Sequence, residues 1–236
     1  MNSKSKSFFE GRTALVTGAN GGLGLVLARA LAGRGCKVYA AVRNPDKFAD
    51  ASNYRLIIPV RLDLTDPDSI DALIPLVADV SLVFNNAGSN RQDSALFCRS
   101  EGAAREEMEV NFFGPLRLAR ALAPLMKDRG EGTFVNLLSI LAFEHLVECG
   151  SYSASKAAAH SLTQGMRAQL QPWGVRVIGV YPGPMDTAMS ASLPLPKVSP
   201  EVVATAIMSA LVSRDDEIYP GDIAQKFHTK WRPYRG

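Results

Sequence analysis

The chain has 236 residues, of which 47% are hydrophobic and 21% are charged, and its formal net charge is +3 at pH 7. These fractions are those of an ordinary globular protein, and so small a net charge does not argue for binding to nucleic acid or to a membrane surface. The three cysteines, Cys36, Cys98 and Cys149, are widely spaced and fit neither a disulfide framework nor a metal site.

The chain begins with polar residues that lack the apolar stretch of a signal peptide. No apolar run approaches the length of a membrane span. Together with the cysteine pattern, this predicts a cytoplasmic protein with no metal and no membrane partner. The length predicts one domain over residues 1–236, with a flexible N-terminus at residues 1–10.

The first predicted strand, residues 13–18, is an apolar run that ends in a glycine-rich turn and is followed by a helical pattern that ends at Gly33 or Gly35. Such a unit presents backbone N–H groups and a helix N-terminus to a phosphate. Glycine is needed where the backbone bends sharply or approaches a ligand without a Cβ in the way. A structural turn alone explains one glycine, whereas this turn holds four, at positions 18, 21, 22 and 24.

The second predicted strand, residues 37–42, ends without a carboxylate and is followed by Arg43. An acidic residue about 20 positions past the turn binds the ribose 2′-hydroxyl of NAD, whereas an arginine suits the 2′-phosphate of NADP. Arg43 can offer its guanidinium fork to that phosphate, although a solvated arginine in a loop is the plainer interpretation. The pattern favours NADP(H) over NAD(H).

Two further strands are predicted at residues 55–63 and 80–85. The helix between them is expected to be capped by Thr65 or Asp66 and to kink or break at Pro75. Small and amide residues, 85–88, follow the fourth strand, at the edge where a doubly wound sheet binds its ligand.

The second half of the chain continues the alternation of helices and strands. Its predicted elements are a long helix at 103–129 bent by Pro115 and Pro124, a strand at 132–139, a loop at 140–150, a helix that carries Tyr152 and ends at 172–174, a strand at 175–181, a helix at 199–213 capped by Ser199, and a strand at 217–219. This alternation predicts an α/β fold: a single-domain, doubly wound (Rossmann-like) parallel sheet of about seven strands with helices on both faces. Residues 222–236 are expected to form a C-terminal tail with a possible subunit contact.

Tyr152 and Lys156 are four residues apart in a helical segment, so their side chains lie on one face. A free tyrosine titrates near ~10, and a nearby positive charge lowers that pKa toward the range useful for acid–base catalysis. Ser139 ends a predicted strand, from which its hydroxyl can reach the same point. A tyrosine and a lysine at this spacing are more often surface residues, and Asn111 alone is a mid-helix asparagine of structural type.

Taken together, these residues closely resemble the short-chain dehydrogenase/reductase family over about residues 12–221. The resemblance rests on the Thr17–Gly24 turn, on Asp63–Leu64, on Asn85–Gly88, on Asn111, Ser139, Tyr152 and Lys156, and on Pro182–Gly183 with Thr187. It departs from the family pattern at Leu138, where a serine is frequent, and at Gly21, where members that use NADP can carry a basic residue.

The resemblance implies a catalytic tetrad of Asn111, Ser139, Tyr152 and Lys156, in which Asn111 holds a water that relays protons to Lys156. The resemblance also implies a set of cofactor contacts, to which the argument from the second strand adds Arg43. The expected contacts are Gly18, Asn20, Gly21, Gly22, Leu23, Gly24, Arg43, Asp63, Leu64, Asn85, Ala87, Gly88, Tyr152, Lys156, Pro182, Gly183 and Thr187. The segment between Thr187 and Ser199 is short, which implies an open or lightly covered pocket. A homodimer or homotetramer that pairs the helices at 103–129 and 152–171 is also implied.

The expected function is NADP(H)-dependent hydride transfer between the nicotinamide and a small-molecule carbonyl or alcohol, with Tyr152 as general acid and base. Candidates on the substrate side are Phe143, His145 and Cys149. The alternatives are an NAD-dependent alcohol dehydrogenase and a protein of the same fold that senses NADP(H) without turnover. A third alternative is nucleic-acid binding through the basic and aromatic tail at 226–235, and it is the least favoured.

Overall fold

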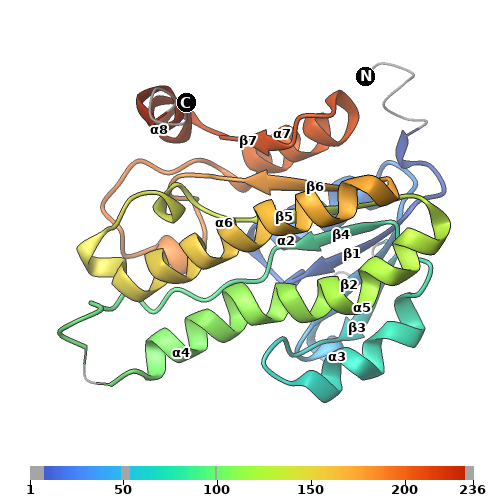
Figure 1. Cartoon of the computed structure of the whole chain (residues 1–236), viewed down its shortest axis with the longest axis horizontal. Coiled ribbons are helices and arrows are strands. Elements are labelled where there is room, and N and C mark those ends of the chain that lie inside the picture. Colours follow the sequence, from blue (N-terminus) through green and yellow to red (C-terminus); the bar gives the residue numbers. More distant parts are fainter. Residues whose placement is uncertain (1–7, 49–53, 99, 232–236) are drawn as a thin grey trace.

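A computed structural model describes residues 8–48, 54–98 and 100–231. Within them, seven parallel strands form one sheet in the order β3-β2-β1-β4-β5-β6-β7 (Figure 1). The strands are β1 (Thr13–Thr17), β2 (Lys37–Val42), β3 (Ile57–Arg61), β4 (Leu82–Asn85), β5 (Gly132–Leu137), β6 (Val175–Val180) and β7 (Glu217–Ile218). The prediction of a doubly wound parallel sheet of about seven strands is confirmed.

The strand order reverses at β1, which pairs with β2 on one side and with β4 on the other. The connections that leave the carboxyl ends of these strands therefore diverge and leave a crevice between them. In open α/β sheets this crevice is the usual ligand site.

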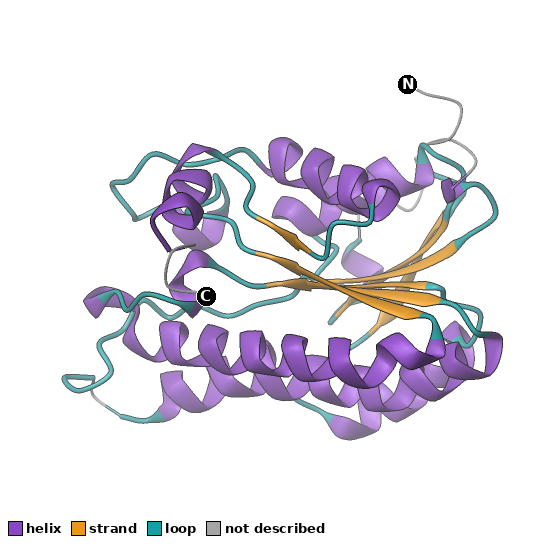
Figure 2. Cartoon of the chain, turned by 45° about the horizontal axis from the view of Figure 1, so that its top comes forward, coloured by secondary structure: helices purple, strands orange, loops and turns teal. Residues whose placement is uncertain are grey.

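Helices cover both faces of the sheet (Figure 2). The layer on one face contains α2 (Gly22–Ala32) and α7 (Pro200–Ser213), which pack together. The layer on the other face contains α3 (Pro67–Leu73), α5 (Gly114–Arg129) and α6 (Gly150–Leu170). The helices are completed by α4 (Gly102–Met108), which packs against α6, and by α8 (Asp222–Trp231).

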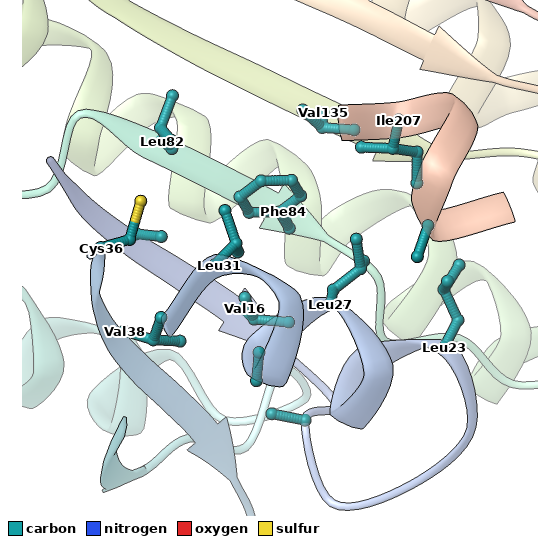
Figure 3. Packing of buried hydrophobic residues seen from close by; sticks show 14 of the residues in the cluster. Val16, Leu23, Leu27, Leu31, Cys36, Val38, Leu82, Phe84, Val135 and Ile207 are labelled. Atoms are coloured by element: carbon teal, nitrogen blue, oxygen red, sulfur yellow. The ribbon is translucent and has the colours of Figure 1, made fainter. Parts of the chain in front are cut away.

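Helix α2 is held on the sheet by one apolar face. Leu23, Leu27 and Leu31 recur every four residues, and all three are buried against the strands (Figure 3). Burying each leucine side chain contributes about 1.5–3 kcal/mol relative to leaving it exposed. This packing fixes the helix N-terminus at the carboxyl end of β1.

The two predicted helix caps are present. Asp66, rather than Thr65, accepts the N–H of Asp68 at 3.0 Å at the start of α3, and Ser199 accepts the N–H of Val202 at 3.3 Å at the start of α7. Helix α3 gives way at Ile74–Val77 to a 3-10 turn that contains Pro75, so the predicted break is confirmed.

The predicted long helix at 103–129 is not continuous. A π-helical segment, Glu109–Phe113, separates α4 from α5. The side chain of Asn111 points inward there and is almost completely buried, and Pro115 lies in the first turn of α5, where a missing N–H is tolerated. Pro115 also has no N–H to offer to the carbonyl of Asn111 four residues earlier. Pro124 lies inside α5 without interrupting it.

Both ends of the described chain are packed. Within the expected flexible N-terminus, Phe9 is fully buried, and its carbonyl accepts a hydrogen bond from the Cys36 thiol. Within the expected tail, residues 222–231 form α8, whose Phe227 and Trp231 stack near Phe143. The burial of aromatic side chains explains why both segments differ from the expectation. Residues 1–7 and 232–236 lie outside the described part of the chain.

Candidate active site

The glycine-rich turn opens the N-terminus of α2 to a ligand. Gly18 and Gly22 adopt left-handed backbone conformations, with φ of +65° and +49°, which favour glycine. Gly21 is the N-cap residue of α2 and has no side chain with which to cap the first turn. The backbone N–H groups of this turn are therefore available to an anion, as the sequence predicts.

Hydrogen bonds between the carboxyl ends of β1 and β4 fix the shape of this turn. Asn86 donates its side-chain amide to the carbonyl oxygens of Thr17 at 2.8 Å and of Gly18 at 3.4 Å. The Thr17 hydroxyl in turn accepts the N–H groups of Asn86 and Ala87 at 3.0 and 2.9 Å. Asn86 is absent from the predicted cofactor contacts and appears only within the segment 85–88, and the pairing of β1 with β4 reveals its role.

The loop after β6 crosses over the same crevice. A Cβ on Gly22 would lie 3.2 Å from the Thr187 side chain, and a Cβ on Gly88 would lie 3.9 Å from Met189. Gln92 donates its side-chain amide to the carbonyl of Met189 at 2.7 Å. The short segment after Thr187 therefore lies against both walls of the crevice.

Arg43 and Asp63 stand at the ends of the neighbouring strands β2 and β3. Asp63 accepts the N–H and the hydroxyl of Thr65 at 3.0 and 2.7 Å. These bonds, opposed by partial burial and assisted by the charges of Arg43 and Arg61, lower the pKa of Asp63 below its usual value. Arg43 is exposed, so its guanidinium is accessible to a ligand phosphate.

Ser139, Tyr152 and Lys156 come together at the carboxyl end of β5. Tyr152 lies in the first turn of α6, Lys156 lies in the next, and the ammonium is 5.6 Å from the centroid of the phenol ring. Ser139 follows β5, accepts the N–H of Leu141 at 3.1 Å and hydrogen-bonds to Tyr152. The structure thus brings together the three residues that the sequence analysis grouped.

The electrostatics of this group differ from the expectation. Burial raises the pKa of Tyr152 above its usual value, and the hydrogen bond from Ser139 opposes this only in part. Burial also lowers the pKa of Lys156 to about 8, because a dry site disfavours the ammonium. The expected depression of the Tyr152 pKa by Lys156 is not found in this arrangement, in which desolvation has the largest effect on that pKa.

Lys156 is positioned by the backbone of β5. Its ammonium donates to the carbonyl of Leu137 at 2.7 Å, and its side chain is almost completely buried. A Cβ on Gly88 would lie 3.8 Å from that ammonium and 3.2 Å from the Asn111 amide oxygen. Because Gly88 has no side chain, the space between it, Lys156 and Asn111 is not filled by a side chain at this position.

The side chain of Asn111 is occupied by structural hydrogen bonds. Its amide nitrogen donates to the carbonyl of Ser89 at 2.8 Å and to the hydroxyl of Ser155 at 2.9 Å, and its amide oxygen accepts the N–H of Ser89 at 2.9 Å. Both amide N–H groups are therefore used. Ser155 is a second residue that the sequence analysis did not single out, because its partner lies on another helix.

Three residues expected to contact the cofactor direct their side chains elsewhere. Asn85 is buried and donates to Asn136 of β5 at 2.8 Å. Leu23 and Leu64 lie in the apolar clusters on the two faces of the sheet. Their side chains pack or bond inside the protein, so only their backbone atoms remain as candidates for cofactor contact.

The candidates on the substrate side differ in exposure. Cys149 is buried, and its sulfur accepts the Asn90 amide at 3.7 Å. His145 is exposed on the rim. Phe143 is partly buried and packs against Tyr181 and the aromatic side chains of α8, so the wall of this side includes a helix that the sequence analysis treated as tail.

Two negative findings apply to the described part of the chain. It contains no group of three or more histidine, cysteine, aspartate or glutamate side chains placed to hold a metal ion. None of its helices combines the length and the apolar composition that crossing a bilayer requires.

Comparison with known proteins identifies the family. Residues 12–197 match the family model of the short chain dehydrogenases. The chain belongs to the short-chain dehydrogenase family. It is 33% identical over 210 residues to an uncharacterized oxidoreductase of Staphylococcus aureus strain MRSA252, a match that covers 85% of this chain and 90% of the relative.

Solved structures of short-chain dehydrogenases share the fold. One, a short-chain dehydrogenase from Burkholderia cenocepacia J2315 in complex with NADP, is 42% identical, with a TM-score of 0.91 and coverage of 96% of this chain and 95% of that one. Another, a short-chain dehydrogenase from Streptomyces avermitilis, is 27% identical, with a TM-score of 0.84 and coverage of 95% and 97%. The protein is an oxidoreductase of this family.

Proposed function

We propose that this oxidoreductase interconverts a carbonyl and an alcohol with NADP(H), and that Tyr152 moves the proton. The observation that carries the proposal is the cluster of Ser139, Tyr152 and Lys156 beside the glycine-rich turn, in the crevice where the strand order reverses. A phenol, a hydroxyl and an ammonium around one point suit a reaction in which an oxygen gains or loses a proton.

The residues present fit a dinucleotide. The uncapped first turn of α2 would hold the diphosphate, Asp63 would face the adenine, and Arg43 would hold the 2′-phosphate. Thr187 and Gly88 would flank the nicotinamide end of the crevice, where the missing side chain of Gly88 leaves room. When bound, the nicotinamide supplies or accepts the hydride.

Side chains of the protein would transfer the proton and bind the substrate oxygen. Because burial raises the pKa of Tyr152, the phenol is protonated at neutral pH and is a proton donor to a carbonyl oxygen. Ser139, bonded to the same phenol, would donate to that oxygen and hold it in place. In oxidation the same side chain, after losing its proton, would take the proton from the alcohol.

Lys156 and Asn111 would supply Tyr152 with a new proton after it has given its own to the substrate. With a pKa near about 8, Lys156 gains and loses a proton close to neutral pH. The Asn111 side chain is already bonded to Ser89 and Ser155, so we propose that its backbone carbonyl, which Pro115 cannot serve, accepts the relay water instead.

The direct test is a fluorescence titration of the purified protein with NADPH and with NADH, followed by turnover of a panel of aliphatic and aromatic aldehydes and ketones. We expect NADPH to bind more tightly and at least one carbonyl to be reduced. Tight NADPH binding without any turnover would favour the sensing alternative, and a preference for NADH would favour an NAD-dependent alcohol dehydrogenase. Binding of neither would refute the function.

Replacing Arg43 with alanine should weaken NADPH binding selectively. A hydrogen bond to a charged group is worth about 1.5–3 kcal/mol, so we expect the Kd for NADPH to rise by roughly tenfold to a hundredfold while the Kd for NADH stays unchanged. The measurement is the same fluorescence titration on Arg43→Ala and on the unmodified protein.

Arg61→Ala is the matched control for Arg43. Arg61 is also exposed and also acts on Asp63, but it ends β3 instead of following β2. Its loss should leave both affinities unchanged. If Arg61→Ala weakened NADPH binding and Arg43→Ala did not, the assignment of the phosphate to Arg43 would be wrong.

We also propose a subunit contact along α6 and along α4 and α5, which follow one another in a line beside α6 (Figure 1). The mass of the protein in solution, measured by light scattering, tests this proposal. A monomer would contradict it.

A further inference from the structure

The loop that crosses the crevice, residues 187–197 (the crossing segment), is closed at its base and held near its tip by one side chain. At the base, Asp186 donates its N–H to the carbonyl of Val198 at 2.9 Å, and Val198 donates to the carbonyl of Pro184 at 2.9 Å. Among the described residues, the hydrogen bonds that join the crossing segment to a distant part of the chain are those with Gln92. The hold on the tip therefore depends on this one residue.

Gln92 uses both ends of its side-chain amide for this contact. Its nitrogen donates to the carbonyl of Met189 at 2.7 Å, and its oxygen accepts the hydroxyl of Ser192. The two partners lie 97 and 100 residues away in the chain. Because donor and acceptor are both used, the amide fixes the crossing segment in orientation as well as in position.

The backbone on both sides of Gln92 is anchored to helices. Arg91 donates its N–H to the buried carboxylate of Glu107, on α4, at 2.7 Å. The carbonyl of Asp93 accepts the N–H of Gly150, at the start of α6, at 3.1 Å. Gln92 thus projects from a fixed wall of the crevice, so the partner that can move is the crossing segment.

Gln92 also has an unusual backbone conformation. Its φ is +51°, which is uncommon and unfavourable for a residue with a Cβ. The other non-glycine residue with positive φ in the described part of the chain, Arg214, follows the end of α7, where this conformation is usual. Gln92 ends no helix, and Asn90 holds its N–H at 2.9 Å. Backbone strain of this kind is concentrated at functional sites.

The bridge made by Gln92 closes the crevice over its inner end. A Cβ on Gly88 would lie 3.9 Å from the Met189 side chain, and a Cβ on Gly22 would lie 3.2 Å from the Thr187 side chain. A dinucleotide that extends from the turn before α2 toward Lys156 would therefore lie beneath the crossing segment.

We propose that Gln92 is a positioning residue that latches the crossing segment over the cofactor, and that breaking its bonds to Met189 and Ser192 is the step that admits and releases the cofactor. The proposal rests on the proposed binding of NADP(H) in this crevice. It adds a residue that controls the rate of cofactor exchange. Because both ends of the amide bond to protein atoms, Gln92 acts on the rates of exchange and not on the affinity.

Gln92→Ala should exchange NADPH faster without losing affinity. Two neutral hydrogen bonds shift a conformational equilibrium by roughly fivefold to a hundredfold. The bonds are the same with and without cofactor, so the association and dissociation rate constants should both rise by that factor, while Kd changes by less than about twofold. The measurement is stopped-flow fluorescence, with NADPH added in the first experiment and displaced by excess NADP+ in the second.

Three variants separate the latch from other roles of this position. Gln92→Asn keeps an amide and suits the left-handed backbone, but it is one methylene shorter and should behave like Gln92→Ala. Ser192→Ala removes one of the two bonds and should raise both rate constants by about two- to tenfold. Gln164→Ala removes an exposed amide from α6 and should change neither.

Any result for Gln92→Ala other than a parallel rise in both rate constants would overturn the proposal. A higher Kd with an unchanged association rate constant would mean that Gln92 contacts the cofactor directly. Normal rate constants in Gln92→Asn would mean that the backbone of this residue, and not its reach to Met189, is what matters.

A second readout needs no cofactor. The N–H groups of Ala191 and Leu193 are bonded within the crossing segment, so hydrogen–deuterium exchange of peptides from residues 187–197 reports on its opening. Exchange should be faster in Gln92→Ala and unchanged in Gln164→Ala, and equal exchange in all three proteins would overturn the proposal. If the protein binds neither NADPH nor NADH but exchange is faster in Gln92→Ala, the cofactor assignment fails while the latch stands.

Discussion

Tyr152→Phe should lose nearly all carbonyl reduction and keep its cofactor. The substitution removes one hydroxyl from a buried ring that borders Ser139 and Lys156. A positioned general acid contributes about 10²–10⁴-fold, so kcat should fall by that factor. The Kd for NADPH should change by about two- to tenfold at most, since a single hydroxyl contributes about 0.5–1.5 kcal/mol to an interaction. Steady-state reduction and the fluorescence titration measure the two effects separately.

The control for this prediction is Tyr54→Phe, which removes a phenol hydroxyl from a partly buried ring that packs against the apolar cluster under α2. It should leave kcat unchanged. If Tyr152→Phe retained turnover within a factor of a few, Tyr152 would not be the proton donor. If instead both activity and NADPH binding vanished, the substitution would have disrupted the cofactor site as well as removed the general acid.

The parts of the site that depend on local sequence could be predicted. The spacing of the glycines specifies the turn before α2, because glycine adopts the left-handed backbone angles of Gly18 and Gly22 with the least strain. The spacing of four residues between Tyr152 and Lys156 places both on one face of α6. The alternation of strands and helices predicts the sheet, although it does not give the order of the strands.

What the sequence could not show depends on partners that are distant in the chain. The burial of Glu107 depends on the packing of α4 against α6, and the side chain of Asn111 bonds to Ser89 and Ser155, which lie 22 and 44 residues away in the chain. The pKa of Tyr152 was expected to fall because only Lys156 is visible as its neighbour at helical spacing. Desolvation, which comes from the whole surrounding fold, has the larger effect.

The glycine-rich turn should tolerate no side chain at position 24. A Cβ on Gly24 would lie 2.3 Å from the carbonyl oxygen of Gly18 and 2.6 Å from the side-chain nitrogen of Asn86. The first of these is a backbone atom, so α2 or the turn must shift. We expect Gly24→Ala to lower the free energy of unfolding by about 3 kcal/mol, the upper part of the usual range for overpacking.

The expected consequence is a lower Tm and a lost cofactor. At about 2–4 °C per kcal/mol for a chain of this size class, Tm should fall by roughly 6–12 °C, as measured by calorimetry. NADPH binding should disappear even well below Tm, because the displaced Asn86 no longer holds the carbonyl oxygens of Thr17 and Gly18.

Gly165→Ala makes the same chemical change in α6, where a Cβ would meet nothing within 4 Å. Alanine is favoured over glycine inside a helix by about 1 kcal/mol, so this control should be slightly more stable than the unmodified protein and should bind NADPH normally. The two variants differ only in what the added methyl group meets. If Gly24→Ala behaved like Gly165→Ala, the close approach of α2 to the turn would be wrong, and with it the geometry on which the phosphate site depends.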